Sequence, residues 1–418
     1  MVLASFGTFL IALAIGQAAA LIGANVAPAA FSTVSFFAGA HPLETLSSEM
    51  PQAAAAVGDA DQLERWAEFL RAQNKPEGAH QALVLASRFN PHSANAWAGL
   101  GFEAARAGHL AEARADFDHA FAVDHQYQPA WTLANFCFRQ NDAECFWRAA
   151  KRAAQVAAPD TASSEFAPLL RLADARALSP IEVLHRLDGG ARIERAYLDQ
   201  LIGARRLPDA VVVAKRMAAS GRAEDAARLD DFVNRLIDAG TWKGAPDISA
   251  GVAIWNALRR FAPLDPEHGV SLTNGGFSTQ PGNTGFDWRV PRGGGVAASW
   301  KPGEIFLRAS EDAFAPPKTR AFDLLTQMLP LAAGRYRLSA EYRTDAAGTP
   351  ARLPQFRWET DGAKSQALEA SSEWREAHFE FRAAVPAYYR LRLRCLREPG
   401  MSAAAISIRL RRIRLEVA

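Results

Sequence analysis

The chain has 418 residues, of which 49% are hydrophobic and 22% are charged, and its formal net charge is +2. These values are typical of a folded protein with more than one domain and exclude global disorder. The small net charge argues against a general attraction to nucleic acid, and three cysteines are too few for a disulfide scaffold or a zinc module.

The first predicted element is a membrane helix at residues 6–26. This stretch, FGTFLIALAIGQAAALIGANV, has no charged side chain and is long enough to cross a bilayer. The first Lys or Arg of the chain is Arg65, whereas a cleaved signal peptide normally opens with basic residues. We therefore expect residues 1–40 to anchor the protein in the inner membrane, with its bulk in the periplasm. Export after cleavage near residues 18–20, and a buried helix of a soluble protein, are the alternatives.

A period of 34 residues follows, in three windows at 60–93, 94–127 and 128–161. Small residues recur where two helices would approach closely, and large apolar residues recur where the space between helices must be filled. The residues that we expect to pack these repeats are Trp97, Gly101, Ala113, Phe117, Ala120 and Trp131.

This pattern resembles the tetratricopeptide repeat in its period and in its residue classes. The resemblance implies a solenoid of helix pairs within residues 41–162, which would bind a protein partner on its concave surface. Residues 163–262 continue as amphipathic helices without a clean period, and we expect a degenerate extension of the solenoid there. The acidic and histidine residues of DFDHAFAVDH (116–125) match no known ligand spacing, so no metal site is expected.

Cys137 and Cys145 are spaced so that they could face each other across a helical turn. In an extracytoplasmic protein they could form a disulfide, but buried unpaired cysteines are common. We expect two free, partly buried thiols.

The helical period ends at a proline-containing linker, residues 262–269, and strand-like alternation replaces it. The stretch 405–417 shifts its phase near Arg411–Arg412, which predicts a β-bulge. About eight short strands predict an all-β sandwich of jelly-roll type over residues 268–418. The strands are expected at 304–309, 320–329, 334–344, 353–360, 374–383, 389–395 and 405–417, with two more in the opening stretch 272–290.

The motifs LTNGGF (272–277), FDLLTQMLPLAAGRYRLSAEYRT (322–344) and EWREAHFEF (373–381) resemble the galactose-binding-like sandwich of many carbohydrate-binding modules. The resemblance covers most of residues 269–418 and implies that the sandwich binds glycan. Many members of that family have an acidic residue after the opening Phe, which helps to hold a structural calcium. Ser278 stands at that place here, so no cofactor is expected.

Aromatic and basic side chains of the sandwich are the candidates for binding a polysaccharide. Residues 269–418 contain 22 Lys+Arg and 15 Asp+Glu, a net charge of +7, which leaves 25 basic and 30 acidic residues, a net charge of −5, on the rest of the chain. Arginines at alternate positions of one strand would form a ladder suited to an acidic polysaccharide, and the alternative is a solvated outer face. The candidates are Trp288, Trp300, Trp358, Trp374, Arg390, Arg392 and Arg394.

Phe286 and Trp288 share one side of the expected strand GFDWR. Paired aromatic residues on one strand face usually bury, so we expect them in the sandwich core, and a sugar-stacking platform is the alternative.

The sequence contains no Gly-x-Ser-x-Gly elbow, no His-Glu-x-x-His motif and no phosphate-binding loop. We therefore predict a non-enzymatic accessory or scaffold protein, whose solenoid binds a protein partner and whose sandwich binds glycan, in exopolysaccharide synthesis or export. The alternatives are a sandwich without a ligand and a glycosidase whose carboxylate pair is assembled only in space.

Overall fold

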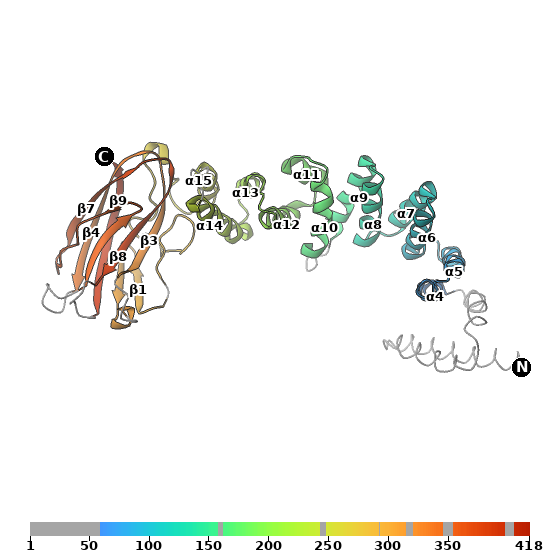
Figure 1. The fold of residues 1–418 in the computed structure, drawn as a ribbon, viewed down its shortest axis with the longest axis horizontal. Coiled ribbons are helices and arrows are strands. Elements are labelled where there is room, and N and C mark those ends of the chain that lie inside the picture. The colour runs from blue at the N-terminus through green and yellow to red at the C-terminus, as the bar shows by residue number, and fades with distance from the viewer. Residues whose placement is uncertain are drawn as a thin grey trace, which may run out of the picture. The chain divides into compact units, whose positions relative to one another are not determined.

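The computed structural model describes residues 59–157, 162–242, 248–291, 293–314, 321–345, 354–397 and 405–418. In this part of the chain, the α-helices α4 to α15 precede a sandwich of two β-sheets (Figure 1). Two compact units are present, Met1–Arg176 with His185–Gly189 and Ala177–Leu184 with Gly190–Ala418. The last helices therefore belong to the same unit as the sandwich, although the sequence pattern placed a boundary between them.

The predicted fold class needs one correction, which concerns its N-terminal membrane helix. Among the residues that the structure describes, no helix combines the length and the apolar character needed to cross a bilayer. Residues 6–26, on which the prediction rested, lie outside the described residues. The fold class is helices followed by a two-sheet sandwich.

Helix hairpins make up the first unit. Polar side chains begin several of the helices: Asp59, Ser93 and Asp142 each accept a hydrogen bond from the backbone N–H three residues later. The hairpins are α4 (Ala60–Ala72) with α5 (Pro76–Phe89), α6 (Ala94–Ala107) with α7 (Leu110–Val123), and α8 (Tyr127–Arg139) with α9 (Ala143–Val156). They are followed by α10 (Ala162–Asp174) and by α11 (Pro180–Leu187), most of which belongs to the second unit.

The close contact of the second hairpin lies where the periodic pattern placed it. A Cβ atom on Gly101 would lie only 2.8 Å from Cε1 of Phe117, and Ala113 and Ala120 are buried on the same helix as Phe117. Trp97 and Trp131 are partly buried instead. The indole Nε1 of Trp97 donates to the Pro91 carbonyl at 2.9 Å, and the ring of Trp131 stacks on Tyr127.

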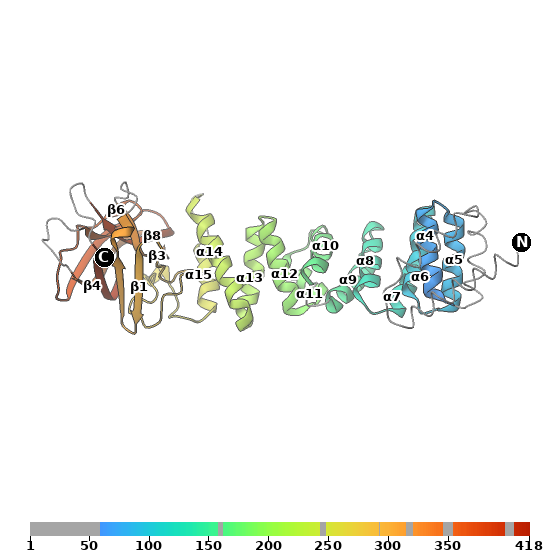
Figure 2. The same ribbon diagram turned by 90° about the horizontal axis from the view of Figure 1, so that it is seen from below.

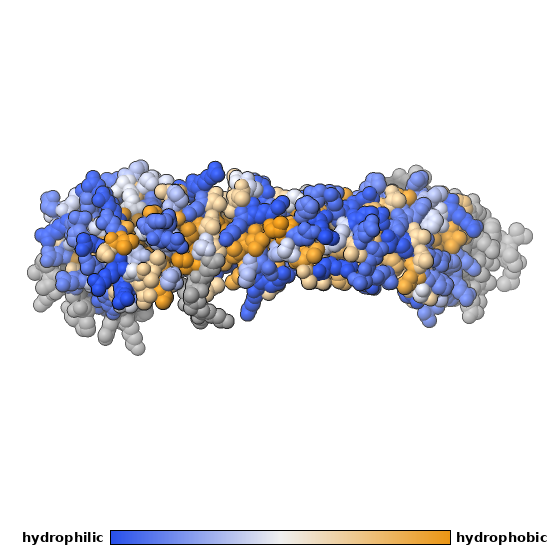
Figure 3. Space-filling model, turned by 90° about the horizontal axis from the view of Figure 1, so that it is seen from above, coloured by the Kyte–Doolittle hydropathy of each residue, from blue (hydrophilic) through white to orange (hydrophobic). Residues whose placement is uncertain are grey.

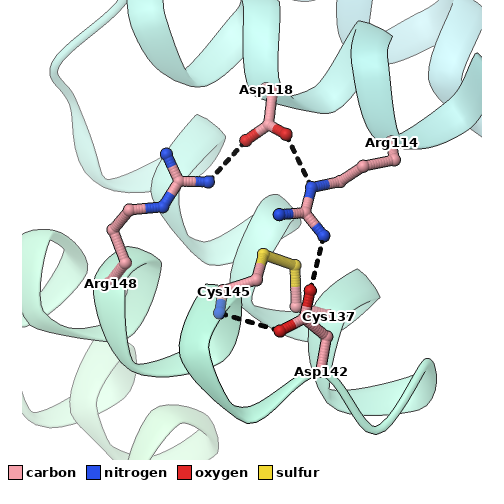
Figure 4. Close-up of a disulfide and its surroundings, with 6 residues drawn as sticks. All are labelled: Arg114, Asp118, Cys137, Asp142, Cys145 and Arg148. Atoms are coloured by element: carbon pink, nitrogen blue, oxygen red, sulfur yellow. Dashed lines mark hydrogen bonds and ion pairs between the residues drawn. A yellow bond between two sulfur atoms is a disulfide. The ribbon is translucent and has the colours of Figure 1, made fainter.

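A disulfide joins Cys137 of α8 to Cys145 of α9 (Figure 4), so the expectation of two free thiols is wrong. The two Cα atoms are 5.8 Å apart, a separation that disulfides commonly span. Asp142 of the same turn accepts from the Cys145 backbone N–H at 3.0 Å and from Arg114 of α7 at 2.7 Å. The turn between α8 and α9 is therefore held by a disulfide and by an ion pair to α7.

Asp116 of α7 is expected to make the stability of the first unit depend on pH. Burial, and then the charge of Glu112, raises the pKa of this carboxyl from 3.8 to about 6, against the opposing effect of His119 and His80. Because the fold favours the neutral form, stability should fall as the pH rises from about 4 to above 6. Asp116→Asn is expected to leave the melting temperature unchanged near pH 4. Near pH 8 it should stabilise the protein by about 1 kcal/mol, because part of the side chain remains in water.

The measurement is thermal unfolding of Asp116→Asn and of the wild type across this pH range. Asp118→Asn is the matched control, since Asp118 pairs with Arg114 and Arg148 at 2.6 Å each and its loss should not stabilise the protein at any pH. A stability difference between Asp116→Asn and wild type that does not change with pH would contradict the prediction.

The second unit begins with helices that lie side by side (Figure 2): α12 (Gly190–Gly203), α13 (Leu207–Ser220), α14 (Ala226–Trp242) and α15 (Ile248–Ala257). Asp225, just before α14, is fully buried. Its carboxylate oxygens pair with Nε of Arg195 at 2.5 Å and with Nε of Arg222 at 2.6 Å, so this buried charge is compensated.

Antiparallel pairing builds both sheets of the sandwich. The five-stranded sheet has the order β1-β2-β9-β4-β7 and the four-stranded sheet the order β3-β8-β5-β6. Their bounds are β1 Val296–Lys301, β2 Glu304–Ala309, β3 Ala321–Leu331, β4 Gly334–Asp345, β5 Gln355–Thr360, β6 Ala363–Lys364, β7 Arg375–Ala383, β8 Ala387–Leu396 and β9 Ile406–Val417. The bulge in β9 is confirmed, because the β4–β9 register shifts there and Arg412 has a φ of 52°.

The two strands expected in residues 272–290 are absent from the structure, which describes this whole stretch. Arg289 forms a single bridge with Thr326, and the preceding residues run as turns. Gly275 explains the path, because a Cβ atom there would lie 2.1 Å from the carbonyl oxygen of Ile413 in β9. The backbone therefore docks against the bulge instead of forming a strand.

Phe286 and Trp288 are both fully buried, but they bury in different places. Trp288 enters the core between the sheets, and its indole Nε1 donates to the Asn274 carbonyl at 3.1 Å. Phe286 packs instead against Trp255 of α15 and Tyr388 of β8, with ring centroids 5.8 Å and 5.6 Å away. The expectation that they share a strand face in the sandwich core is therefore wrong for Phe286.

Asn234 of α14 connects the helices to the sandwich through side-chain hydrogen bonds. Its side-chain oxygen accepts from the Gly285 backbone N–H and from Arg289, both at 2.8 Å, and its amide nitrogen donates to Thr284 at 3.0 Å. One side chain thus fixes three residues of the loop that leads into the sandwich.

Candidate functional site

Three of the tryptophans named from the sequence lie with the sandwich core. Trp288 and Trp358 are 0% and 1% exposed, and their rings lie 6.4 Å apart. Trp300 packs against the same core, and its Nε1 donates to the Phe277 carbonyl at 2.9 Å. Trp288 and Trp358 therefore present no open ring for a sugar and are corrected to core residues, whereas Trp300 is only partly buried at the edge of the core.

Trp374 is different, because it lies on the outer face of the five-stranded sheet. Its ring faces the guanidinium groups of Arg411 and Arg343, whose central carbons are 4.0 Å and 5.1 Å from the ring centroid. The segment before it is held to β4, since Thr344 and Ser371 exchange hydrogen bonds of 2.7 Å and 2.9 Å. The ring is therefore positioned over β4 and β9 by the backbone as well as by the arginines.

Two further residues extend this surface toward β2. Arg409 of β9 lies opposite Arg343 in the strand register, and its guanidinium lies 4.5 Å from the ring centroid of Phe306. We call the surface formed by Phe306, Arg343, Trp374, Arg409 and Arg411 the aromatic–arginine face. Of its five residues, only Trp374 was predicted from the sequence to bind a ligand.

The positive charges of the aromatic–arginine face are only partly compensated. Arg409 pairs with Glu304 at 3.0 Å, and Arg411 pairs with Glu341 at 2.5 Å. No carboxylate among the described residues pairs with Arg343, whose buried Nε has no hydrogen-bond partner there. This face can therefore offer both aromatic ring surface and N–H donors.

The predicted arginine ladder lies on the outer face of the four-stranded sheet, as strand alternation required. Most of its charge is compensated, which the sequence did not reveal. Arg394 pairs with Asp323 at 3.0 Å and with Glu359 at 3.1 Å, and Arg392 pairs with Asp361 at 3.5 Å. The side chain of Arg390 is exposed and has no ion pair among the described residues.

A shallow cavity of about 330 Å³ lies beside Arg390. Its walls come from β3, from β8 and from the loop that Asn234 holds, and its lining residues are Arg289, Val290, Pro291, Asp323, Thr326, Met328 and Arg390. The face of the sandwich that is seen at the left of Figure 3 is mainly hydrophilic.

A second hollow, of about 380 Å³, lies in the first unit between α4, α5 and α6. Charged residues of both signs line it, together with one apolar and one amide side chain: Asp61, Glu64, Arg65, Glu68, Arg71, Leu83 and Asn95. Such a surface suits polar contacts more than a buried apolar ligand.

Comparison with known proteins finds similarity at the level of solved structures. No family model matches the chain, and no curated protein matches it. Among solved structures, a CBM4 module is 14% identical and aligns over 35% of this chain and 100% of its own, with a TM-score of 0.26. TmCBM61, solved with beta-1,4-galactotriose, is 15% identical over 35% of this chain and 96% of its own, with a TM-score of 0.25.

The CBM22-1 xylan-binding domain of Paenibacillus barcinonensis Xyn10C gives 11% identity over 34% of this chain and 90% of its own, with a TM-score of 0.24. These neighbours are carbohydrate-binding modules, and this chain ends in a β-sandwich. Likeness at this level says nothing about a ligand, so the functional argument rests on the residues themselves.

Proposed function

We propose that this protein is a non-enzymatic glycan-binding protein whose sandwich holds polysaccharide on the aromatic–arginine face. The observation that carries the proposal is Trp374, an indole ring packed against two arginines on an outer sheet face. The apolar C–H face of a sugar ring can stack on an indole, while guanidinium groups donate hydrogen bonds to hydroxyls and carboxylates.

An acidic polysaccharide is the ligand class that the charges favour. Residues 269–418 carry a net charge of +7, and Arg343 has no carboxylate partner among the described residues. A bound carboxylate would supply the missing partner through charge-assisted hydrogen bonds. We infer that the protein acts in exopolysaccharide synthesis or export.

The helical part is proposed to bind a protein partner, as a tetratricopeptide-type array would. Its support is the 34-residue period, the close contact at Gly101, and the charged hollow beside α4. We place the protein outside the cytoplasm, and the Cys137–Cys145 disulfide supports this location, because such bonds persist in oxidising compartments.

Polysaccharide binding by the full chain tests the proposal. We expect polygalacturonate to bind more tightly than dextran and to weaken at high salt, since exposed charges are screened beyond about 10 Å at 0.1 M. Trp374→Ala should weaken binding about tenfold or more. The magnitude follows from ligand rings that stack on an aromatic side chain, whose loss costs about 1–3 kcal/mol. Binding would be followed by affinity electrophoresis and by calorimetry.

Arg382→Gln is the matched control. Arg382 is exposed on β7 of the same sheet and pairs in register with Arg335, at the end of β7 away from Trp374. It removes one positive charge without touching the aromatic–arginine face, so binding should be nearly unchanged. Failure of both polysaccharides to bind, or equal binding by Trp374→Ala and wild type, would reject the proposal.

A further inference from the structure

The cavity beside Arg390 is separate from the aromatic–arginine face, because its walls belong to the four-stranded sheet. Backbone hydrogen bonds fix one wall: the Arg289 N–H donates to Thr326 at 2.7 Å, and the Thr326 N–H donates back at 2.9 Å. Met328 faces Arg390 directly in the β3–β8 register. A volume of about 330 Å³ lies at the small end of the range for ligand pockets, which suits one sugar residue.

Arg289 carries a poorly compensated charge in this wall. Its Nη2 donates to two neutral acceptors, the Asn234 side chain at 2.8 Å and the Gly285 carbonyl at 3.1 Å. Its Nε is buried and has no hydrogen-bond partner among the described residues. Burial lowers the pKa of Arg289, the charge of Asp238 opposes this effect, and the charge of Arg390 lowers the pKa to a smaller extent.

Two guanidinium groups therefore line one cavity, and neither forms an ion pair within the described part of the chain. The positive charge of Arg289 is only partly exposed to water and has no ion pair, and an anion placed between the two guanidinium groups would stabilise it. Asp323, which also lines the cavity and pairs with Arg394, limits the choice of anion. Its own negative charge disfavours a phosphate dianion but allows a singly charged carboxylate, and it can accept a hydrogen bond from a sugar hydroxyl.

We propose that this cavity is a second glycan site that takes one acidic sugar residue, with its carboxylate between Arg289 and Arg390. The apolar surfaces of Val290, Pro291 and Met328 lie against the C–H face of the ring. Asn234 of α14 acts as a positioning residue, because it holds the Arg289 guanidinium in place. The site goes beyond the proposed function and does not depend on Trp374.

The test uses the full chain and free glucuronate, with glucose and inorganic phosphate as comparison ligands, in ligand-observed NMR titrations. Glucuronate should bind about tenfold more tightly than either comparison ligand, a difference of about 1.4 kcal/mol. Arg390→Gln removes an exposed side chain and should weaken glucuronate about tenfold while leaving the melting temperature unchanged. Arg289→Lys keeps the charge but loses the forked donors, so it should weaken glucuronate as well.

Arg382→Gln is the control and should bind glucuronate as the wild type does. Trp374→Ala separates the two sites, because glucuronate binding that persists in Trp374→Ala and is weakened in Arg390→Gln comes from the cavity. The cavity proposal would be overturned by glucuronate that does not bind, by equal binding to Arg390→Gln, or by tighter binding of phosphate. If Arg289→Lys does not fold, Arg390→Gln alone decides.

Discussion

Replacing Phe286 by Ala is expected to lower the free energy of unfolding of the second unit by about 3–5 kcal/mol. The ring is fully buried between Trp255 of α15 and Tyr388 of β8, so its removal leaves a cavity at the junction of the helices and the sandwich. The neighbouring rings cannot easily collapse into that space, because the Tyr388 hydroxyl already donates to the Ile248 carbonyl at 3.3 Å. Denaturant unfolding followed by tryptophan fluorescence measures the effect.

Phe306→Ala is the matched control for Phe286→Ala. Phe306 is only partly buried and lies on the outer face of the five-stranded sheet. Its replacement should cost about 1 kcal/mol or less, as partly exposed residues usually do. Equal losses from the two variants would mean that the junction does not stabilise the unit.

Gly101→Leu in α6 is expected to destabilise the first unit by about 1–3 kcal/mol, because the added side chain must displace the ring of Phe117. Thermal unfolding of the full chain would show an earlier transition for the first unit. Gly203→Leu at the end of α12 is the matched control, since a Cβ atom there meets nothing within 4 Å. If Gly101→Leu unfolded at the same temperature as the wild type, the helices would not meet closely at this position.

Elements whose pattern is local were predictable from the sequence. The alternation in residues 334–344 and 389–395 marks β4 and β8, and the phase slip near Arg412 marks the bulge in β9. The opening stretch 272–290 was misread for a physical reason. Its aromatic residues are spaced as in a strand, but its backbone forms only one β-bridge, between Arg289 and Thr326. Phe286 packs against Trp255 of α15, a helix that precedes it in the chain.

The candidate site was predictable to a smaller extent, because its charges are compensated across long distances in sequence. The outward direction of Arg390, Arg392 and Arg394 follows from alternation, but two of them are paired with residues of β3, of β5 and of the turn after β5. Likewise Arg343 and Arg411 come together only through the β4–β9 pairing. The sequence places each residue on a face of its strand, but it does not place the strands beside one another.

The buried disulfide has a consequence for the order in which the chain matures. The Cys137 and Cys145 side chains are 0% and 2% exposed, so a soluble oxidant cannot reach them once the surrounding helices have packed. We therefore expect the bond to form most rapidly while α8 and α9 are still open to solvent, on a chain that is only partly folded. In a chain that folds under reducing conditions, the two thiols would be buried before they are oxidised. An oxidant added after folding would then form the disulfide only slowly.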